Sequence, residues 1–245
     1  MIKILVSDYD NTFYLSDVDI QINKKAVKAF RNNGNKFIIA TGRSYLALKS
    51  KIEKYNIDYD FIIINHGATI IGKNNEIIYN FIIENEILNS LKKDLKIEEY
   101  NIEYLNYKSE KQETNVYFCC SCFDSRVDFS NNDLTKIAVV YNDNIDVSKL
   151  VQDINKKYPM INAYLVSKNM IEIISSNINK SKAISLLADY YNLDSTCIYT
   201  VGDGYSDISM IKDYQGYAMK NSVPELNHIA IKSVDSVSQL IYEIM

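Results

Sequence analysis

The stretch MIKILVSDYDNT, residues 1–12, decides the fold of this chain. Its apolar residues 4–6 lead into two carboxylates two positions apart, Asp8 and Asp10, and the hydroxyl of Thr12 follows. A short apolar run bounded by turn-forming residues is typical of a buried strand. In an open α/β sheet the carboxyl ends of the strands line the crevice that binds ligands. Taken alone, the stretch fits either a ligand site or a turn that caps the next helix.

Two further segments repeat this pattern along the first third of the chain. Residues 37–40 form an apolar run that ends in Thr-Gly-Arg at residues 41–43. Residues 60–64 form another, which ends in Asn-His-Gly at residues 65–67. Both runs are short enough to be buried strands, and both end in polar residues as the first one does.

The segments between these runs have the spacing of amphipathic helices. We expect a helix over residues 24–33, with Asn23 as its N-cap and Gly34 as its stop. A second helix is expected from Ser44, as its cap, to about residue 55. The order strand, helix, strand, helix, strand predicts right-handed crossovers and a parallel sheet with helices on both faces.

The pattern changes after residue 68. Two short apolar segments, residues 69–71 and 77–81, flank a polar turn and predict a hairpin. Residues 81–175 then mix helices with antiparallel strands, which is the pattern of an α+β architecture. We therefore predict an inserted α+β domain over residues 81–175 and one sheet domain made of residues 1–80 and 176–245.

The last third returns to the first pattern. Asn179 is placed to cap a helix, and Lys180 stands at the start of that helix. Residues 197–201 form an apolar strand that is followed by Asp203 and Asp207. The remaining expected elements are two strands and a closing helix, at residues 216–219, 229–231 and 236–244.

Composition narrows the class of protein. The chain has 245 residues, of which 47% are hydrophobic, and this is enough for a full core. Its 31 acidic and 27 basic residues form no block of like charge, so neither a nucleic acid nor a membrane is an expected partner. No apolar run is long enough to span a bilayer, and the N-terminus lacks the signal-peptide pattern. The four cysteines, three of them clustered at residues 119, 120 and 122, do not make a disulfide scaffold. We expect a cytoplasmic protein, and nothing in the sequence sets an oligomeric state.

The polar strand ends point to phosphoryl chemistry. Parallel strands end at one edge of a sheet, so the carboxylates are expected to lie together with Thr41 and Lys180. Carboxylates in one crevice repel one another unless a hard cation lies between them, and an all-oxygen site with positions left for water and substrate suits Mg²⁺. A metal, a lysine and a threonine hydroxyl form a pocket for a phosphoryl group, which a carboxylate can attack to give an aspartyl-phosphate.

These residues resemble the four motifs of the haloacid dehalogenase superfamily, in the same order along the chain. The motifs read Asp8-Tyr9-Asp10-Asn11-Thr12, Thr41-Gly42-Arg43, Lys180 and Gly202-Asp203-Gly204-Tyr205-Ser206-Asp207. The long insert between the second and third motifs resembles the type IIB cap of the Cof-like sugar-phosphate phosphatases. The resemblance implies an α/β fold with a Rossmann-like, three-layer parallel-sheet core and an inserted α+β cap domain.

The resemblance also implies a role for each carboxylate. Asp8 would be the nucleophile and a ligand of Mg²⁺. Asp10 would be the general acid that protonates the leaving group and then the base for the hydrolytic water, and its backbone carbonyl would bind the metal. Asp203 and Asp207 would complete the metal site. We expect the metal and Lys180 to hold the pKa of Asp8 low.

The remaining motif residues would surround the phosphoryl group. The resemblance implies that Thr41 and Lys180 hold its oxygens and that Thr12 lies there and orients Asp10. Gly42 and Arg43 belong to the same site, Arg43 as a salt-bridge partner rather than a catalytic group. Asn221 matches a further polar position near the phosphate.

The implied activity is Mg²⁺-dependent hydrolysis of small phosphomonoesters, with sugar phosphates as the first candidates. Two alternatives stay open: a phosphomannomutase-like phosphotransferase, and a weakly active regulatory protein that binds phosphorylated metabolites. The second is motivated by Asn11 and Ser206, which stand where the family has Gly and Asn. His66 lies in an Asn-His-Gly stretch where the family has Asn-Gly, and it either contacts substrate or forms a loop hydrogen bond.

Overall fold

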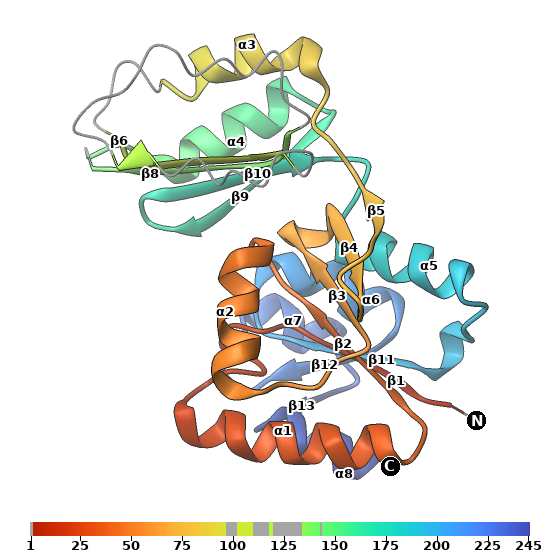
Figure 1. The fold of residues 1–245 in the computed structure, drawn as a ribbon. Helices are drawn as coiled ribbons and strands as arrows, with labels where there is room; N and C mark the ends of the chain where they lie inside the picture. Colours follow the sequence, from red (N-terminus) through yellow and green to blue (C-terminus); the bar gives the residue numbers. More distant parts are fainter. Residues whose placement is uncertain (1, 97–101, 110–117, 120–133, 143) are drawn as a thin grey trace. The chain divides into compact units, whose positions relative to one another are not determined.

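The computed structural model describes residues 2–96, 102–109, 118–119, 134–142 and 144–245, with two compact units (Figure 1). One unit consists of Met1–Tyr79 and Asn179–Met245, and the other is the continuous segment Asn80–Ile178. The first unit is therefore made of two segments that are far apart in the sequence. In the described part of the chain, no helix has the length and apolar character that a membrane span requires.

The first sheet has eight strands in the order β13-β12-β11-β1-β2-β3-β4-β5. Neighbouring strands from β13 to β3 are parallel, and β4 is antiparallel to β3. The strand that begins the chain therefore lies in the interior of the sheet, between β2 and β11. The bounds are β1 (Ile4–Ser7), β2 (Lys36–Ala40), β3 (Phe61–Ile64), β4 (Thr69–Gly72), β5 (Ile77–Asn80), β11 (Ile198–Gly202), β12 (Gln215–Met219) and β13 (Lys232–Val234).

Helices cover both faces of this sheet. The helices are α1 (Asp17–Asn32), α2 (Tyr45–Tyr55), α5 (Lys180–Tyr190), α6 (Ile208–Asp213), α7 (Pro224–Ile229) and α8 (Val237–Ile244). Figure 1 shows α1 and α8 side by side, and their apolar faces form one core with the strands, including Leu5. Ile4 and Val6 point to the other face of the same strand and are also buried. The fold is thus the predicted α/β architecture.

Helix α1 begins earlier than the apolar spacing predicts. Its N-cap is Ser16, whose hydroxyl accepts a hydrogen bond from the backbone N–H of Asp19, so the prediction of Asn23 as the cap is wrong. Asn23 lies inside the helix and is fully buried. Its side chain donates to the backbone oxygen of Phe13 and accepts from the backbone N–H of Ser238. Asn23 therefore connects the first and last segments of the unit instead of starting a helix.

Two other local predictions also change. Residues 229–231 do not form a strand: α7 runs to Ile229, and the edge strand β13 begins at Lys232. Pro224 at the first turn of α7 explains the helix, because its fixed φ and missing N–H suit that position. Ser44 precedes α2 as predicted, but its side chain makes no capping hydrogen bond.

The second unit has its own five-stranded sheet, in the order β7-β6-β8-β10-β9. All described pairs in this sheet are antiparallel. Two helices pack with the sheet around a separate apolar core. The bounds are α3 (Asn85–Asp94), β6 (Ile102–Ser109), β7 (Phe118–Cys119), β8 (Leu134–Tyr141), α4 (Val147–Lys157), β9 (Ile161–Ser167) and β10 (Met170–Ser175). Of the three clustered cysteines, Cys120 and Cys122 lie outside the described residues.

A buried ion pair joins two strands of the second sheet. Lys136 on β8 donates from Nζ to Oε1 of Glu172 on β10 at 2.6 Å, and less than a tenth of either side chain is exposed. Two buried charges are stable only with partners, because leaving water costs several kcal/mol for each ion.

Removing one partner of this pair is expected to destabilise the protein more than removing both. Lys136→Met should lower the free energy of unfolding by about 3–5 kcal/mol, since Glu172 then loses the lysine that balances its charge. A double variant with Glu172→Leu should regain most of that loss. Urea unfolding followed by circular dichroism measures both, and a double variant no more stable than Lys136→Met would contradict the expectation.

Candidate active site

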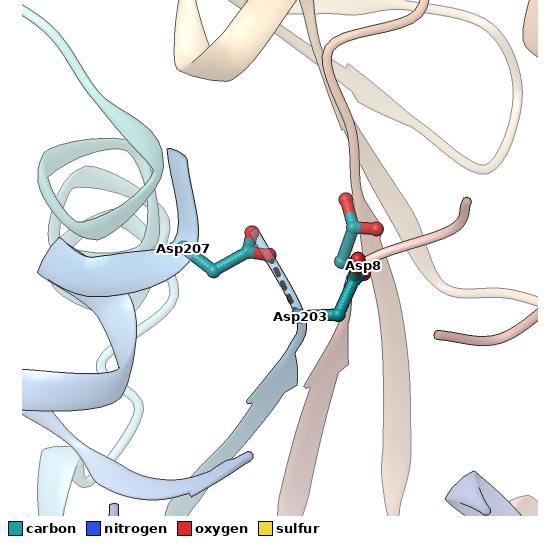
Figure 2. Close-up of side chains that lie close together, drawn as sticks. All are labelled: Asp8, Asp203 and Asp207. Carbon is teal, nitrogen blue, oxygen red and sulfur yellow. Dashed lines mark hydrogen bonds between the residues drawn. The ribbon is translucent and has the colours of Figure 1, made fainter. Parts of the chain in front are cut away.

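Three carboxylates meet at the carboxyl edge of the first sheet (Figure 2). Asp8 follows β1, Asp203 follows β11, and Asp207 ends the short 3-10 helix η4 (Tyr205–Asp207). Because β1 and β11 are parallel neighbours, their ends lie side by side. One oxygen from each carboxylate lies within 4.8 Å of the others. The structure thus brings together the three side chains that were predicted to bind the metal.

Asp207 is held by the backbone of its own loop. Its Oδ2 accepts hydrogen bonds from the backbone N–H of Asp203 at 3.0 Å and of Gly204 at 2.9 Å. A Cβ at Gly202 would lie 2.5 Å from the Asp207 carboxyl carbon, so a side chain there would displace this carboxylate. Gly202 is therefore required because the Asp207 carboxylate lies too close to its Cα to leave room for a side chain.

Lys180 connects two of the three carboxylates. Its Nζ donates to Oδ1 of Asp8 and to Oδ1 of Asp207, both at 2.6 Å, and its side chain is 0% exposed. Lys180 starts α5, where the side chain of Asn179 caps the helix by accepting from the backbone N–H of Lys182. Lys182 is exposed, so Lys180 is the lysine that reaches the site.

Burial and charge act against each other in this cluster. Burial raises the pKa of Asp8 well above its usual range, and Lys180 offsets this effect only in part. Burial likewise raises the pKa of Asp203 to about 6. Burial opposes the charge of Lys180, but the carboxylates of Asp207 and Asp8 outweigh it and raise the pKa of the lysine. Lys180 alone therefore does not keep the pKa of Asp8 low, and the lower pKa that we expect requires the metal as well.

The donor set fits a divalent cation. Three carboxylates face one lysine, so the cluster keeps a negative charge when all four groups are ionised. The three side chains offer carboxylate oxygens, and the predicted ligand from Asp10 is a carbonyl oxygen, so all candidate ligands suit a hard cation such as Mg²⁺. A cation held by Asp8, Asp203 and Asp207 would offset the repulsion that Lys180 leaves.

The side chain of Asp10 does not belong to this cluster, and its predicted role in binding the metal concerns its backbone carbonyl. Its two oxygens accept hydrogen bonds from Arg43, from Nε and from Nη2, both at 2.7 Å. Thr12, predicted to orient Asp10, instead donates to Oδ1 of Asp203 at 2.6 Å and is fully buried. The side chains of the first motif therefore divide between the acidic cluster and the arginine.

The turn of the first motif keeps its shape without glycine. Asn11 adopts a left-handed backbone with φ of 57°, a conformation that Asn tolerates better than most residues. Its backbone oxygen accepts a hydrogen bond from the side chain of Asn221 at 3.0 Å. Asn221, predicted near the phosphate, thus supports the turn that carries Asp10.

The Asn-His-Gly loop at residues 65–67, whose role the sequence did not settle, supports the Thr-Gly-Arg turn. The backbone N–H of His66 donates to the oxygen of Thr41 at 3.0 Å, and that of Asn65 donates to the oxygen of Arg43 at 3.0 Å. The His66 ring lies against Gly42, where a Cβ would overlap it. Asn65, His66 and Gly67 all have positive φ, of 51°, 56° and 112°.

The same loop also approaches the lysine helix. A Cβ at Gly67 would lie 2.5 Å from the backbone oxygen of Asn179, the residue that caps the helix of Lys180. The loop η1 (Asn65–Gly67) therefore packs against both the Thr-Gly-Arg turn and the start of α5. In the sequence, only Asn65 and Gly67 of these three residues indicate a turn with positive φ, because asparagine and glycine tolerate that conformation.

Comparison with known proteins identifies relatives along the whole chain. A family model described as haloacid dehalogenase-like hydrolase matches residues 5–239. A protein of Buchnera aphidicola subsp. Baizongia pistaciae, provisionally named a phosphatase, is 27% identical to this chain over an alignment of 270 positions. The alignment covers 100% of this chain and 98% of that protein.

Solved structures share the fold over the same extent. A haloacid dehalogenase-like hydrolase from Bacteroides thetaiotaomicron matches with a TM-score of 0.81 at 20% identity, covering 100% of both chains. A protein described as a sugar phosphatase of subclass IIB in the same superfamily matches with a TM-score of 0.81 at 18% identity, covering 99% of this chain and 100% of that one.

A methyl group at Gly42 is expected to disturb the Thr-Gly-Arg turn. Gly42→Ala should lower the free energy of unfolding by about 1–3 kcal/mol, the usual cost of overpacking, because its Cβ overlaps the His66 ring. Adding His66→Ala should restore part of the loss by making room. Thermal unfolding of the single and double variants tests this, and strictly additive losses would show that the two residues do not clash.

A divalent cation is expected to stabilise the protein through the acidic cluster. At a concentration about 100 times its dissociation constant, Mg²⁺ should add roughly 2.7 kcal/mol of stability and raise the melting temperature. Asp203→Asn should remove most of this shift, whereas Asp235→Asn, an exposed aspartate paired with Lys220, should keep it. An equal shift in both variants would place the cation elsewhere.

Proposed function

This chain belongs to the haloacid dehalogenase-like hydrolases, and from that premise we propose that it is a Mg²⁺-dependent phosphatase of small phosphomonoesters. One observation carries the proposal: a fully buried lysine bridges Asp8 and Asp207 beside Asp203. A structural role alone does not favour three carboxylates around one buried cation, because their repulsion costs stability. A site that binds a divalent cation needs such an excess of negative oxygen ligands, and the cation then offsets their repulsion of a phosphoryl group.

In the proposed reaction Asp8 is the nucleophile. Lys180 binds Oδ1 of Asp8, and Oδ2 attacks phosphorus while Asp10 gives its proton to the leaving oxygen as the bond from phosphorus to that oxygen breaks. Water then attacks the phosphorus of the aspartyl-phosphate and gives a proton to Asp10. The bond from phosphorus to the Asp8 oxygen breaks, so that phosphate is released and the Asp8 carboxylate is restored. A bound Mg²⁺ supplies charge stabilisation for the phosphoryl oxygens.

The other residues of the edge position these groups. Lys180 and the hydroxyl of Thr41 are proposed to hold phosphoryl oxygens, with Gly42 close by in the same turn. Thr12 keeps Asp203 in place as a ligand through its 2.6 Å hydrogen bond. Asn221 supports the turn of Asn11 from outside. Catalysis then depends mainly on in-line positioning and electrostatics.

Sugar phosphates are the first substrates that we propose. The support is the likeness to a protein described as a sugar phosphatase, together with an α+β segment inserted at the place where that subclass carries its cap. We assign the segment Asn80–Ile178 as this cap domain. We propose that the substrate is a small phosphorylated metabolite and that the enzyme acts in the cytoplasm.

Phosphate release with and without metal tests the proposal. Wild-type protein should release inorganic phosphate from a panel of sugar phosphates and from para-nitrophenyl phosphate with Mg²⁺, and should lose this activity in EDTA. Asp8→Asn should lower the rate by roughly 10³-fold or more, the scale on which removal of a nucleophile acts. Asp235→Asn serves as the matched control, since Asp235 pairs with an exposed lysine.

Two outcomes would count against the proposal. Near-native phosphate release by Asp8→Asn would show that another group attacks phosphorus. Transfer of the phosphoryl group to a second sugar hydroxyl without free phosphate would favour the phosphotransferase alternative.

A further inference from the structure

Asp10 and Arg43 form a two-point ion pair beside the acidic cluster. Arg43 donates from Nε to Oδ2 and from Nη2 to Oδ1 of Asp10, both at 2.7 Å. Because a guanidinium matches both oxygens of a carboxylate, this contact fixes the plane of the Asp10 carboxylate as well as its position. The Asp10 side chain is 42% exposed, so another partner can replace part of the contact.

Arg43 itself is held in place from several sides. Its guanidinium lies 5.6 Å from the centroid of the buried Tyr9 ring, within the range of a cation–π contact. Its backbone N–H donates to Oγ1 of Thr41 at 3.1 Å, and its backbone oxygen accepts from Asn65 at 3.0 Å. The arginine is thus fixed at its main chain and at its charged end, which suits a residue that orients another side chain.

The geometry points to Arg43 as a positioning residue for Asp10, an inference that rests on the proposed phosphatase function. For the first step Asp10 takes up a proton from water on one of its oxygens, so the N–H···O contact to that oxygen gives way and the protonated oxygen faces the leaving oxygen, while the other contact keeps the carboxyl group aimed. The proton of Asp10 moves to the leaving oxygen as its bond to phosphorus breaks. The Asp10 carboxylate that results is again bound by both N–H groups of Arg43. Arg43 therefore acts on departure of the leaving group and not on binding of the phosphoryl group.

The nature of the leaving group separates these two roles. An alkoxide leaves only when it is protonated, so hydrolysis of an alkyl phosphate depends on Asp10 being aimed correctly. A nitrophenolate leaves as a stable anion and needs no proton. If Arg43 acts through Asp10, its loss slows the first step for alkyl esters alone. If Arg43 binds the phosphoryl group, its loss affects both esters.

The test compares Arg43→Ala and Arg43→Lys with wild type on a sugar phosphate and on para-nitrophenyl phosphate. First-turnover rates isolate phosphorylation of Asp8 from the hydrolysis that follows, in which Asp10 also acts. Both variants should lose roughly 10²-fold or more on the sugar phosphate, the usual contribution of a positioned general acid, with KM unchanged. Both should keep the first-turnover rate on the aryl ester. Arg43→Lys should not restore the rate on the sugar phosphate, because lysine keeps the positive charge but cannot donate two parallel hydrogen bonds to the Asp10 carboxylate.

The chain offers a matched control at the opposite edge of the sheet. Arg31 binds Asp60 in the same two-point way, at 2.8 Å and 3.0 Å, and Asp60 precedes β3. Arg31→Ala removes an equivalent contact and should leave the ratio of the two first-turnover rates unchanged. In an Asp10→Asn background, Arg43→Ala should cause no further loss on the sugar phosphate. Melting temperatures confirm that each variant is folded.

Three results would overturn the inference. An equal loss on both esters with a raised KM would make Arg43 a phosphoryl ligand, and no loss on either would make the pair a structural salt bridge. A further loss in the Asp10→Asn background would show that Arg43 does not act through Asp10. Wild-type protein that hydrolyses neither ester in an Asp8-dependent way would refute the proposed function itself, a result distinct from the other three.

Discussion

The site depends on one buried charge, the ammonium group of Lys180. No part of its side chain is exposed, so it must find its partners inside the protein, and it finds them in Asp8 and Asp207. The three residues come from the end of β1, the start of α5 and the loop after β11. Only a parallel arrangement of β1 and β11 brings these ends together. The buried ammonium group of Lys180 is therefore neutralised only when the strands are arranged in this topology.

Burying these carboxylates costs the folded state stability. Burial raises the pKa of Asp8 and of Asp203, which means that the folded state disfavours the charge of these groups. The loop behind the Thr-Gly-Arg turn adds non-glycine residues with positive φ, Asn65 and His66, each in a sparsely populated backbone region. Strain of both kinds gathers where the proposed reaction takes place. The fully packed cores of the two units supply the stability that tolerates it.

The sequence was sufficient to predict the residues that follow strands. Asp8 and Asp203 were expected at one edge because parallel strands end together, and Lys180 joins them from the start of α5. Contacts between side chains of separate loops carry no such periodic signal. The pairing of Asp10 with Arg43 and the hydrogen bond from Thr12 to Asp203 therefore became evident only in three dimensions.

The interior place of β1 has a consequence for synthesis of the protein. β1 leaves the ribosome long before its neighbour β11, and Lys180 follows Asp8 by 172 positions. At ordinary translation rates of about 5–20 residues per second, one edge of β1 waits roughly 10–40 s for its partner. During that interval the nascent chain presents an unpaired apolar strand, a template for aggregation that chaperones normally cover. The candidate site is thus among the last parts of the molecule to form, and a chain truncated before β11 lacks both Asp203 and Asp207.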